Sequence, residues 1–201
     1  CAESAYVYLG FKEGVSREEW ISDVYRQDID GMLSMLNKLP VKNGDCVFVE
    51  GGVPHAIGEG CFMIEVQEPS DLMGVVEKKT PSGKEIADIK LHGGIGFDNM
   101  LKMFAYKGES LGEIKERYTY SPKKLWENVY EVIGKSVTDK FSIHVIEGGG
   151  KITPPNKNGT VIITDGKGNI NSIEVKKGDR LFFNSDDEIT AEGDLKAVIC
   201  C

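Results

Sequence analysis

Apolar residues recur at helical spacing near the start of the chain. A strand is predicted over residues 6–11, where tyrosines and a phenylalanine surround a glycine. Beyond it, Ser16 and Glu19 have the spacing of a capping box, in which each side chain accepts a hydrogen bond from the other residue's backbone amide. Gly31 is expected to break the following helical run in two. The apolar positions of that run are Trp20, Val24, Ile29, Met32, Met35 and Leu36.

After residue 40 the apolar period changes to two, which predicts short strands. These strands are expected at Cys46–Val49, Cys61–Val66 and Met73–Glu77. A helix is predicted from Phe97 to Phe104, after a glycine-rich loop. A second helix is predicted over residues 121–134, because Ser121 is a favourable N-cap and Pro122 fits the first helical position.

From Phe141 to the last residue the pattern is entirely strand-like. Short apolar runs alternate with turns of Gly, Asn and Asp at even spacing, which favours a sandwich or a barrel. The chain therefore reads as helix, β, helix and β in order. The expected fold class is mainly β with helical insertions.

Composition narrows the classes of function. Of the 201 residues, 40% are apolar and 28% are charged, which is ordinary for a globular protein. A net charge of −8 disfavours nucleic acid as a partner, and no apolar run reaches the about 18 residues of a membrane span. Five cysteines without a CxxC pair, and no leader pattern, indicate reduced thiols and a cytoplasmic location. The start at Cys1, without an initiator Met, suggests a piece of something longer.

The clearest chemical signal surrounds His55. Gly44, Glu50, Gly52 and His55 follow the pattern G-(x)5-E-x-G-x-x-H. This pattern resembles the second sequence motif of the cupin superfamily, which has proline where Glu50 stands here. A tight glycine corner between two strands would aim the imidazole into the mouth of a barrel, where its neutral nitrogen can bind a divalent cation.

Longer stretches resemble the type I mannose-6-phosphate isomerases in their short bacterial form. They are PHAIGEGCFMIEVQEPSD, KKTPSG, GGIGFDNM and, near the start, YLGFKEGVSREEW. The resemblance implies a double-cupin, jelly-roll fold whose N-terminal barrel is incomplete here. Residues 1–77 would hold a helical segment and the remainder of the metal-bearing barrel, residues 78–139 a helix-containing connector, and residues 140–201 a C-terminal cupin-like β domain.

The same resemblance implies a site. The family holds one zinc ion with Gln, His, Glu and a final His, and the final His falls on His55. The other ligands are expected upstream of Cys1. Acidic residues that line the family's sugar pocket fall on Glu65 and Asp71, which are the expected substrate-binding residues. The family's arginine beside the sugar falls on Val75, so this chain departs from the pattern there.

The activity implied is the metal-dependent interconversion of mannose 6-phosphate and fructose 6-phosphate through an enediol-type intermediate. The sequence does not identify the catalytic base. The alternative function is that of a non-catalytic cupin homologue that binds a sugar or sugar phosphate, and a third is a structural interaction module. A small sugar phosphate is the expected partner, and either a homodimer or a missing N-terminal segment is expected to cover the open barrel edges.

Simpler roles stay open for single residues. His55 without its motif would be read as a packed or capping histidine. Glu65 could be an outward-facing charge, and Asp71 could cap the turn after Pro69. His92 is read as a loop residue, and His144 as facing solvent or a strand neighbour.

Overall fold

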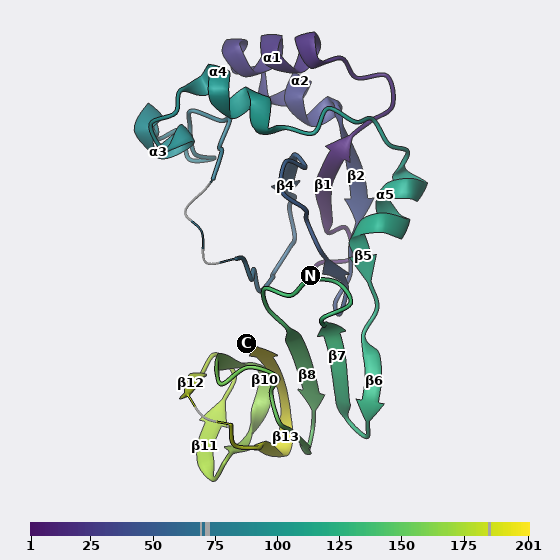
Figure 1. Cartoon of the computed structure of the whole chain (residues 1–201), viewed down its shortest axis with the longest axis vertical. Coiled ribbons are helices and arrows are strands. Elements are labelled where there is room, and N and C mark those ends of the chain that lie inside the picture. Colours follow the sequence, from purple (N-terminus) through teal and green to yellow (C-terminus); the bar gives the residue numbers. More distant parts are fainter. Residues whose placement is uncertain (69, 71–72, 185) are drawn as a thin grey trace. The chain divides into compact units, whose positions relative to one another are not determined.

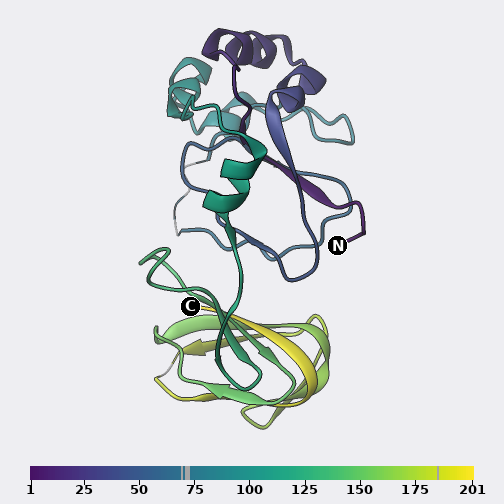
Figure 2. The ribbon, with the colours of Figure 1, turned by 90° about the vertical axis from the view of Figure 1, so that its right-hand side faces the viewer.

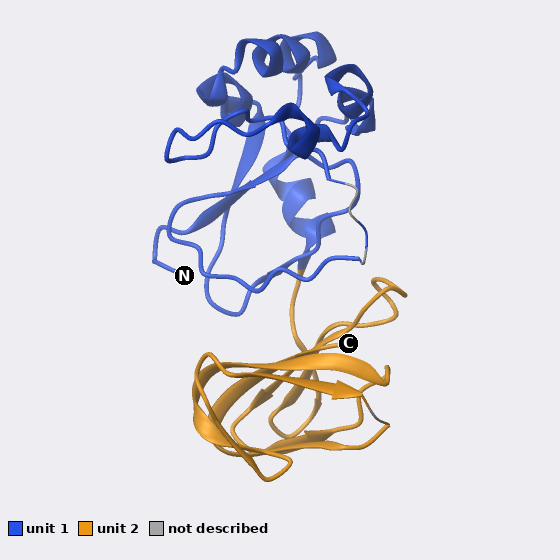
Figure 3. Ribbon diagram, turned by 90° about the vertical axis from the view of Figure 1, so that its left-hand side faces the viewer, with its two compact units in different colours: residues 1–119 blue, residues 120–201 orange. Residues whose placement is uncertain are grey.

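The chain divides into two compact units, residues 1–119 and residues 120–201 (Figure 3). This computed structural model describes residues 1–68, 70, 73–184 and 186–201. Each unit has its own sheet, and the apolar cores of the two units share no residues. The predicted division after residues 77 and 139 differs from the boundary between residues 119 and 120.

The first unit is built on a three-stranded antiparallel sheet in the order β2-β1-β4 (Figure 1). These strands are β1 (Tyr6–Phe11), β2 (Leu36–Pro40) and β4 (His55–Ile57). The other elements are α1 (Arg17–Arg26), α2 (Ile29–Ser34), β3 (Cys46–Val47), α3 (Asp88–His92), α4 (Phe97–Met100), the 3-10 helix η1 (Leu101–Met103), α5 (Leu111–Tyr118) and β5 (Thr119–Tyr120). The predicted strand over residues 6–11 and the predicted helix after Gly96 are confirmed.

Two apolar cores lie on the two faces of this sheet. Successive residues of a strand point to opposite faces, so Tyr8 and Leu9 join different cores. In the first core, helix residues pack on residues of β1 and β2, and its buried members are Phe11, Trp20, Val24, Met32, Leu36 and Leu101. The second core brings α5 against the other face and contains Leu9, Leu39, Ile114 and Tyr118.

The predicted capping box at the start of α1 is confirmed. The Ser16 hydroxyl accepts a hydrogen bond from the Glu19 amide at 3.1 Å, and the Glu19 carboxylate accepts one from the Ser16 amide at 3.0 Å. The helical run is broken into two helices as predicted, but Gly31 is not the position of the break. The break comes at Gln27, which is left-handed at φ 55°, and Gly31 lies inside α2, where a side chain would collide with Asp23.

The predicted helix over residues 121–134 is wrong. This stretch forms a hairpin of β6 (Lys123–Trp126) and β7 (Val129–Ile133), which turns at Asn128 with φ 62°. Strand β7 also pairs with β8 (Ile143–Glu147), so tertiary pairing overrides the helix-start signal of Ser121 and Pro122. Apolar β-branched residues in β7 favour the strand.

The strands predicted at residues 61–66 and 73–77 are also wrong. Both stretches lack regular structure in the described residues, because no neighbouring strand pairs with them. The second stretch is held instead by a hydrogen bond from the Val75 amide to the Leu91 carbonyl at 2.9 Å. Alternating apolar residues did not produce a strand here, and Phe62, Met63 and Met73 are exposed.

The second unit is an antiparallel sheet in the order β11-β10-β13-β8-β7-β6, and its strands curve around a shared interior (Figure 2). Strand β12 also pairs with β10, and β9 with β13. The remaining bounds are β9 (Gly150–Ile152), β10 (Asn158–Ile170), β11 (Ile173–Lys176), β12 (Arg180–Asn184) and β13 (Ile189–Cys200). The predicted C-terminal β pattern is confirmed.

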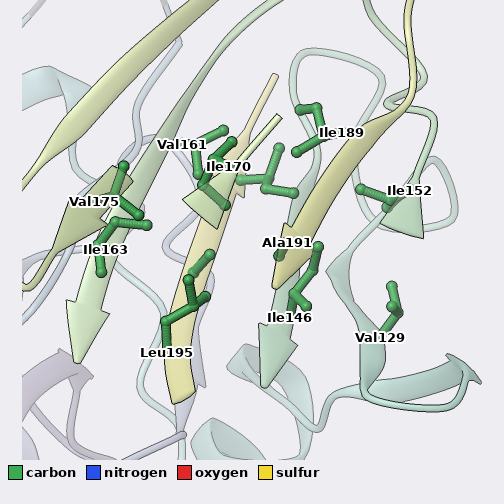
Figure 4. Close-up of a cluster of buried hydrophobic side chains, with 12 residues drawn as sticks. Val129, Ile146, Ile152, Val161, Ile163, Ile170, Val175, Ile189, Ala191 and Leu195 are labelled. Atoms are coloured by element: carbon green, nitrogen blue, oxygen red, sulfur yellow. The ribbon is translucent and has the colours of Figure 1, made fainter. Parts of the chain in front are cut away.

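Side chains from most of these strands meet in one core (Figure 4). Ile146 of β8 faces Val129 of β7 and Ala197 of β13 across the sheet, and all three are fully buried. The expected fold class, mainly β with helical insertions, is confirmed. Closure of the sheets into jelly-roll barrels stays a prediction.

Candidate functional site

His55 begins β4 and lies opposite Leu9 of β1 in the sheet. Its side chain is exposed, and its Nδ1 lies 3.0 Å from the Val53 carbonyl oxygen. A carbonyl oxygen only accepts hydrogen bonds, so Nδ1 must carry the proton. A ring that carries its proton on Nδ1 offers Nε2 as the nitrogen for a metal ion.

The turn before His55 is the glycine corner that the sequence predicted. The Val53 amide donates to the Glu50 carbonyl at 3.2 Å, and Gly52 is left-handed at φ 84°. The Ala105 amide donates to the Gly52 carbonyl at 2.8 Å. A Cβ at position 52 would lie 2.7 Å from the Met103 carbonyl oxygen, so only glycine allows this close approach.

The expected substrate-binding residues are less well placed. Glu65 is exposed in a stretch without regular structure, and in the described residues no hydrogen bond or ion pair joins it to His55. Asp71 lies outside the described residues. Val75 is half-buried. Its side chain is aliphatic, so it offers no charged group for a phosphate or an enediolate.

A complete metal site is not formed by these residues. A catalytic zinc ion normally has three protein ligands and an open position. Within the described ranges, no three His, Cys, Asp or Glu side chains converge to hold a metal ion. The tautomer of His55 suits one ligand position, but the remaining donor set is not present in this part of the chain.

In the part of the chain that the structure describes, no strand pairs with the outer edge of β4 beside His55. β4 is the last strand in the order β2-β1-β4, so its outer backbone groups face away from β1. Ile57 of β4 is exposed (54%), and so are Phe62 (74%) and Met63 (42%) in the segment that follows this strand. An unpaired edge flanked by apolar side chains favours pairing with another strand.

A charged network that the sequence analysis missed lies next to the His55 turn. Arg117 donates from Nη2 to Glu50 at 2.6 Å and from Nη1 to Glu109 at 3.2 Å. Lys107 Nζ also donates to Glu109, at 2.7 Å. The Glu109 side chain is only 7% exposed. Burial alone would raise the pKa of Glu109, but the hydrogen bonds from Lys107 and Arg117 outweigh it and hold that pKa below its usual range.

We expect Glu109→Gln to lower the free energy of unfolding of the first unit by about 1–3 kcal/mol at pH 7. Because the pKa of Glu109 is lowered on folding, its stabilisation is complete above the ordinary glutamate pKa of about 4.3 and is lost as the pH falls through the folded value. Urea unfolding at pH 7 and in acid checks this, since the difference between wild type and variant should shrink in acid. An equal difference at both pH values would contradict it.

The other two histidines have structural surroundings. His92 ends α3, and its Nδ1 accepts from the amides of Gly94 and Gly96 at 3.1 and 3.2 Å, which fixes the glycine loop. Of the two predicted alternatives for His144, the strand neighbour is confirmed, because His144 is 4% exposed in β8 between Glu131 and Ile199. Among the described residues its Nδ1 has no hydrogen-bond partner, and its Nε2 is 3.9 Å from a Glu131 carboxylate oxygen.

Acid is expected to destabilise the second unit through His144. Burial lowers the pKa of His144, and the nearby Glu131 carboxylate only partly opposes this. The unfolded chain therefore binds more protons as the pH falls below the ordinary histidine pKa of about 6.5, so stability falls with it. We expect His144→Leu to flatten the dependence of the melting temperature on pH between 7 and 5. An unchanged slope in that variant would contradict this assignment.

Comparison with solved structures identifies the class of fold. A single-residue variant of phosphomannose isomerase from Salmonella typhimurium superposes on 98% of this chain with a TM-score of 0.61 and 12% identity. A protein from Archaeoglobus fulgidus proposed to be a mannosephosphate isomerase also superposes on 98% of it, with a TM-score of 0.60 and 15% identity. The chain spans 65% and 57% of these two proteins. It therefore has the fold of phosphomannose isomerases over almost its whole length.

A comparison of sequences points to the same proteins. Over 69 residues the chain is 39% identical to the mannose-6-phosphate isomerase of Streptococcus mutans, a match that covers 34% of this chain and 21% of that relative. No family model matches the chain. The predicted resemblance to the mannose-6-phosphate isomerases is confirmed. Of the helices in the described residues, none has the length and apolarity needed to cross a bilayer.

Proposed function

We propose that this chain forms part of an isomerase that interconverts mannose 6-phosphate and fructose 6-phosphate. The supporting observation is the His55 turn, whose backbone fixes the imidazole with Nε2 free, in a chain with the fold of phosphomannose isomerases. The 69-residue likeness to a mannose-6-phosphate isomerase supports the choice of sugar.

The reaction is a proton transfer between adjacent carbons. A base removes the proton from C2 of the open-chain aldose, and the electrons shift toward O1, which takes a proton to give the enediol. The C2 hydroxyl then gives up its proton to become the ketone oxygen, and a proton is added at C1. No oxidant or reductant is needed, because the electrons stay within the sugar. We assign no base, since no residue in the described part is placed for this role.

A divalent cation, zinc, is proposed as the cofactor, with His55 Nε2 as one ligand. The other ligands would come from segments that these 201 residues do not include, which agrees with the incomplete donor set. When bound, the cation would polarise the sugar oxygens. Glu65 and Asp71 are proposed to bind sugar hydroxyl groups, and the open edge of β4 is proposed to pair with a strand from a second copy or from a longer form of the chain.

The test is to follow mannose 6-phosphate in D2O by proton NMR, with the longest natural form of the protein and added zinc. The proposal predicts fructose 6-phosphate as product, with solvent deuterium at the carbon that receives the proton. Saturable binding of the sugar phosphate without turnover would contradict it and would favour a non-catalytic homologue. Neither binding nor turnover would favour an interaction module.

A further inference from the structure

The orientation of His55 depends on one backbone carbonyl. The Val53 oxygen accepts the hydrogen bond from His55 Nδ1, so the position of Val53 decides which ring nitrogen is left free. Val53 in turn belongs to the turn that starts at Glu50, because its amide donates to the Glu50 carbonyl. Whatever fixes Glu50 therefore also affects the imidazole.

The position of Glu50 in the motif normally has proline, which would stiffen the turn by fixing its φ angle. Glutamate does not do this, but its carboxylate reaches Arg117 at 2.6 Å. Arg117 lies on α5, 67 residues away, so the ion pair joins the turn to a helix that packs on the sheet. A side-chain contact here takes the place of a backbone constraint.

Arg117 is itself held by a buried group. Its second nitrogen donates to Glu109, whose amide donates to the Phe11 carbonyl at 2.9 Å. The buried Asn37 side chain donates to the Glu109 carbonyl, also at 2.9 Å. Because Phe11 is in β1 and Asn37 in β2, the network anchors Arg117 to the same sheet that carries His55. A guanidinium with two fixed carboxylates has little freedom to move.

We propose that Arg117 is a positioning residue for His55. Through Glu50 it holds the turn from Glu50 to Val53 so that the Val53 carbonyl receives the Nδ1 proton and Nε2 stays free. The proposal rests on the proposed function only for the use of that Nε2 as a metal ligand. The tautomer itself is a property of this chain without any metal or substrate.

The test is the tautomer of His55, read from long-range proton–nitrogen NMR of the metal-free protein at pH 8. Wild type is expected to hold the Nδ1–H form. Arg117→Gln should shift His55 toward the Nε2–H form. Glu50→Gln should give the same shift. The Glu50 side chain is about half exposed, and Arg117 keeps its bond to Glu109 in this variant, so the variant is expected to fold. It therefore tests the proposal even if Arg117→Gln fails to fold.

Lys107→Gln is the matched control. Lys107 binds the same Glu109 oxygen as Arg117 but does not contact Glu50, so its loss should leave the tautomer unchanged. The double variant Glu50→Pro/Arg117→Gln should restore the Nδ1–H form, because proline stiffens the turn without an ion pair. An unchanged tautomer in folded Glu50→Gln, or an equal shift in Lys107→Gln, would overturn the proposal. A tautomer shift without isomerase activity would instead count against the proposed function alone.

Discussion

Replacing His55 with alanine is expected to lower mannose 6-phosphate turnover by at least about 10²-fold, because it removes one of the proposed ligands of the cation. The same variant should lose bound zinc, measured as moles of metal per mole of chain after dialysis. The imidazole is exposed and its ring makes one hydrogen bond to the backbone, so little of the fold depends on it.

The melting temperature is the control for this variant. Because the imidazole is exposed and lies outside the cores, its loss should change the free energy of unfolding by no more than about 0.5 kcal/mol, as a surface substitution does. The melting temperature should therefore change little. Full turnover and full zinc content in a folded His55→Ala protein would show that His55 is not a ligand. Loss of turnover together with unfolding would contradict the view that its role is local.

Replacing Ile146 with alanine is expected to lower the free energy of unfolding of the second unit by about 2–5 kcal/mol. Ile146 is fully buried in β8, where it pairs with Val129 of β7 and Ala197 of β13. Truncating it would leave a cavity in the apolar core that Figure 4 shows. A unit of this size has a total stability of about 4–12 kcal/mol, so the loss is a large part of it. Urea unfolding, followed by the fluorescence of Trp126, measures the change.

Ile173→Ala is the matched control in the same sheet. Ile173 begins β11 and is 55% exposed, so the same change of side chain should cost well under about 1 kcal/mol. Equal losses for the two variants would show that the core assigned to the second unit is not its source of stability.

Local chemistry predicted some helix ends well and missed others. Ser16 and Glu19 form the predicted capping box, and Ser110 with Glu113 forms an identical one at the start of α5. The second box has the same sequence signal and could have been recognised. Ser121 and Pro122 also carry a helix-start signal, yet strand pairing with β8 makes that stretch a hairpin, which depends on residues far along the chain.

The candidate site also has features that the sequence could predict and features that it could not. The glycine turn at Gly52 was predictable, because it depends on residues within a few positions of one another, whereas the aim of His55 into a barrel stays a prediction. The Glu50–Arg117 pair was not, since its partners are 67 residues apart and only the packing of α5 on the sheet brings them together. Glu65 was assigned to the pocket from the spacing in the family it resembles, and the strand expected around it is not formed.

The most direct test of the account is a coupled assay of mannose 6-phosphate turnover by the longest natural form of this chain, before and after treatment with a chelator. The account predicts turnover that the chelator abolishes and that added zinc restores, with the His55→Ala protein inactive throughout. Absence of turnover in folded protein supplied with zinc, or turnover that neither the chelator nor the loss of His55 affects, would contradict it.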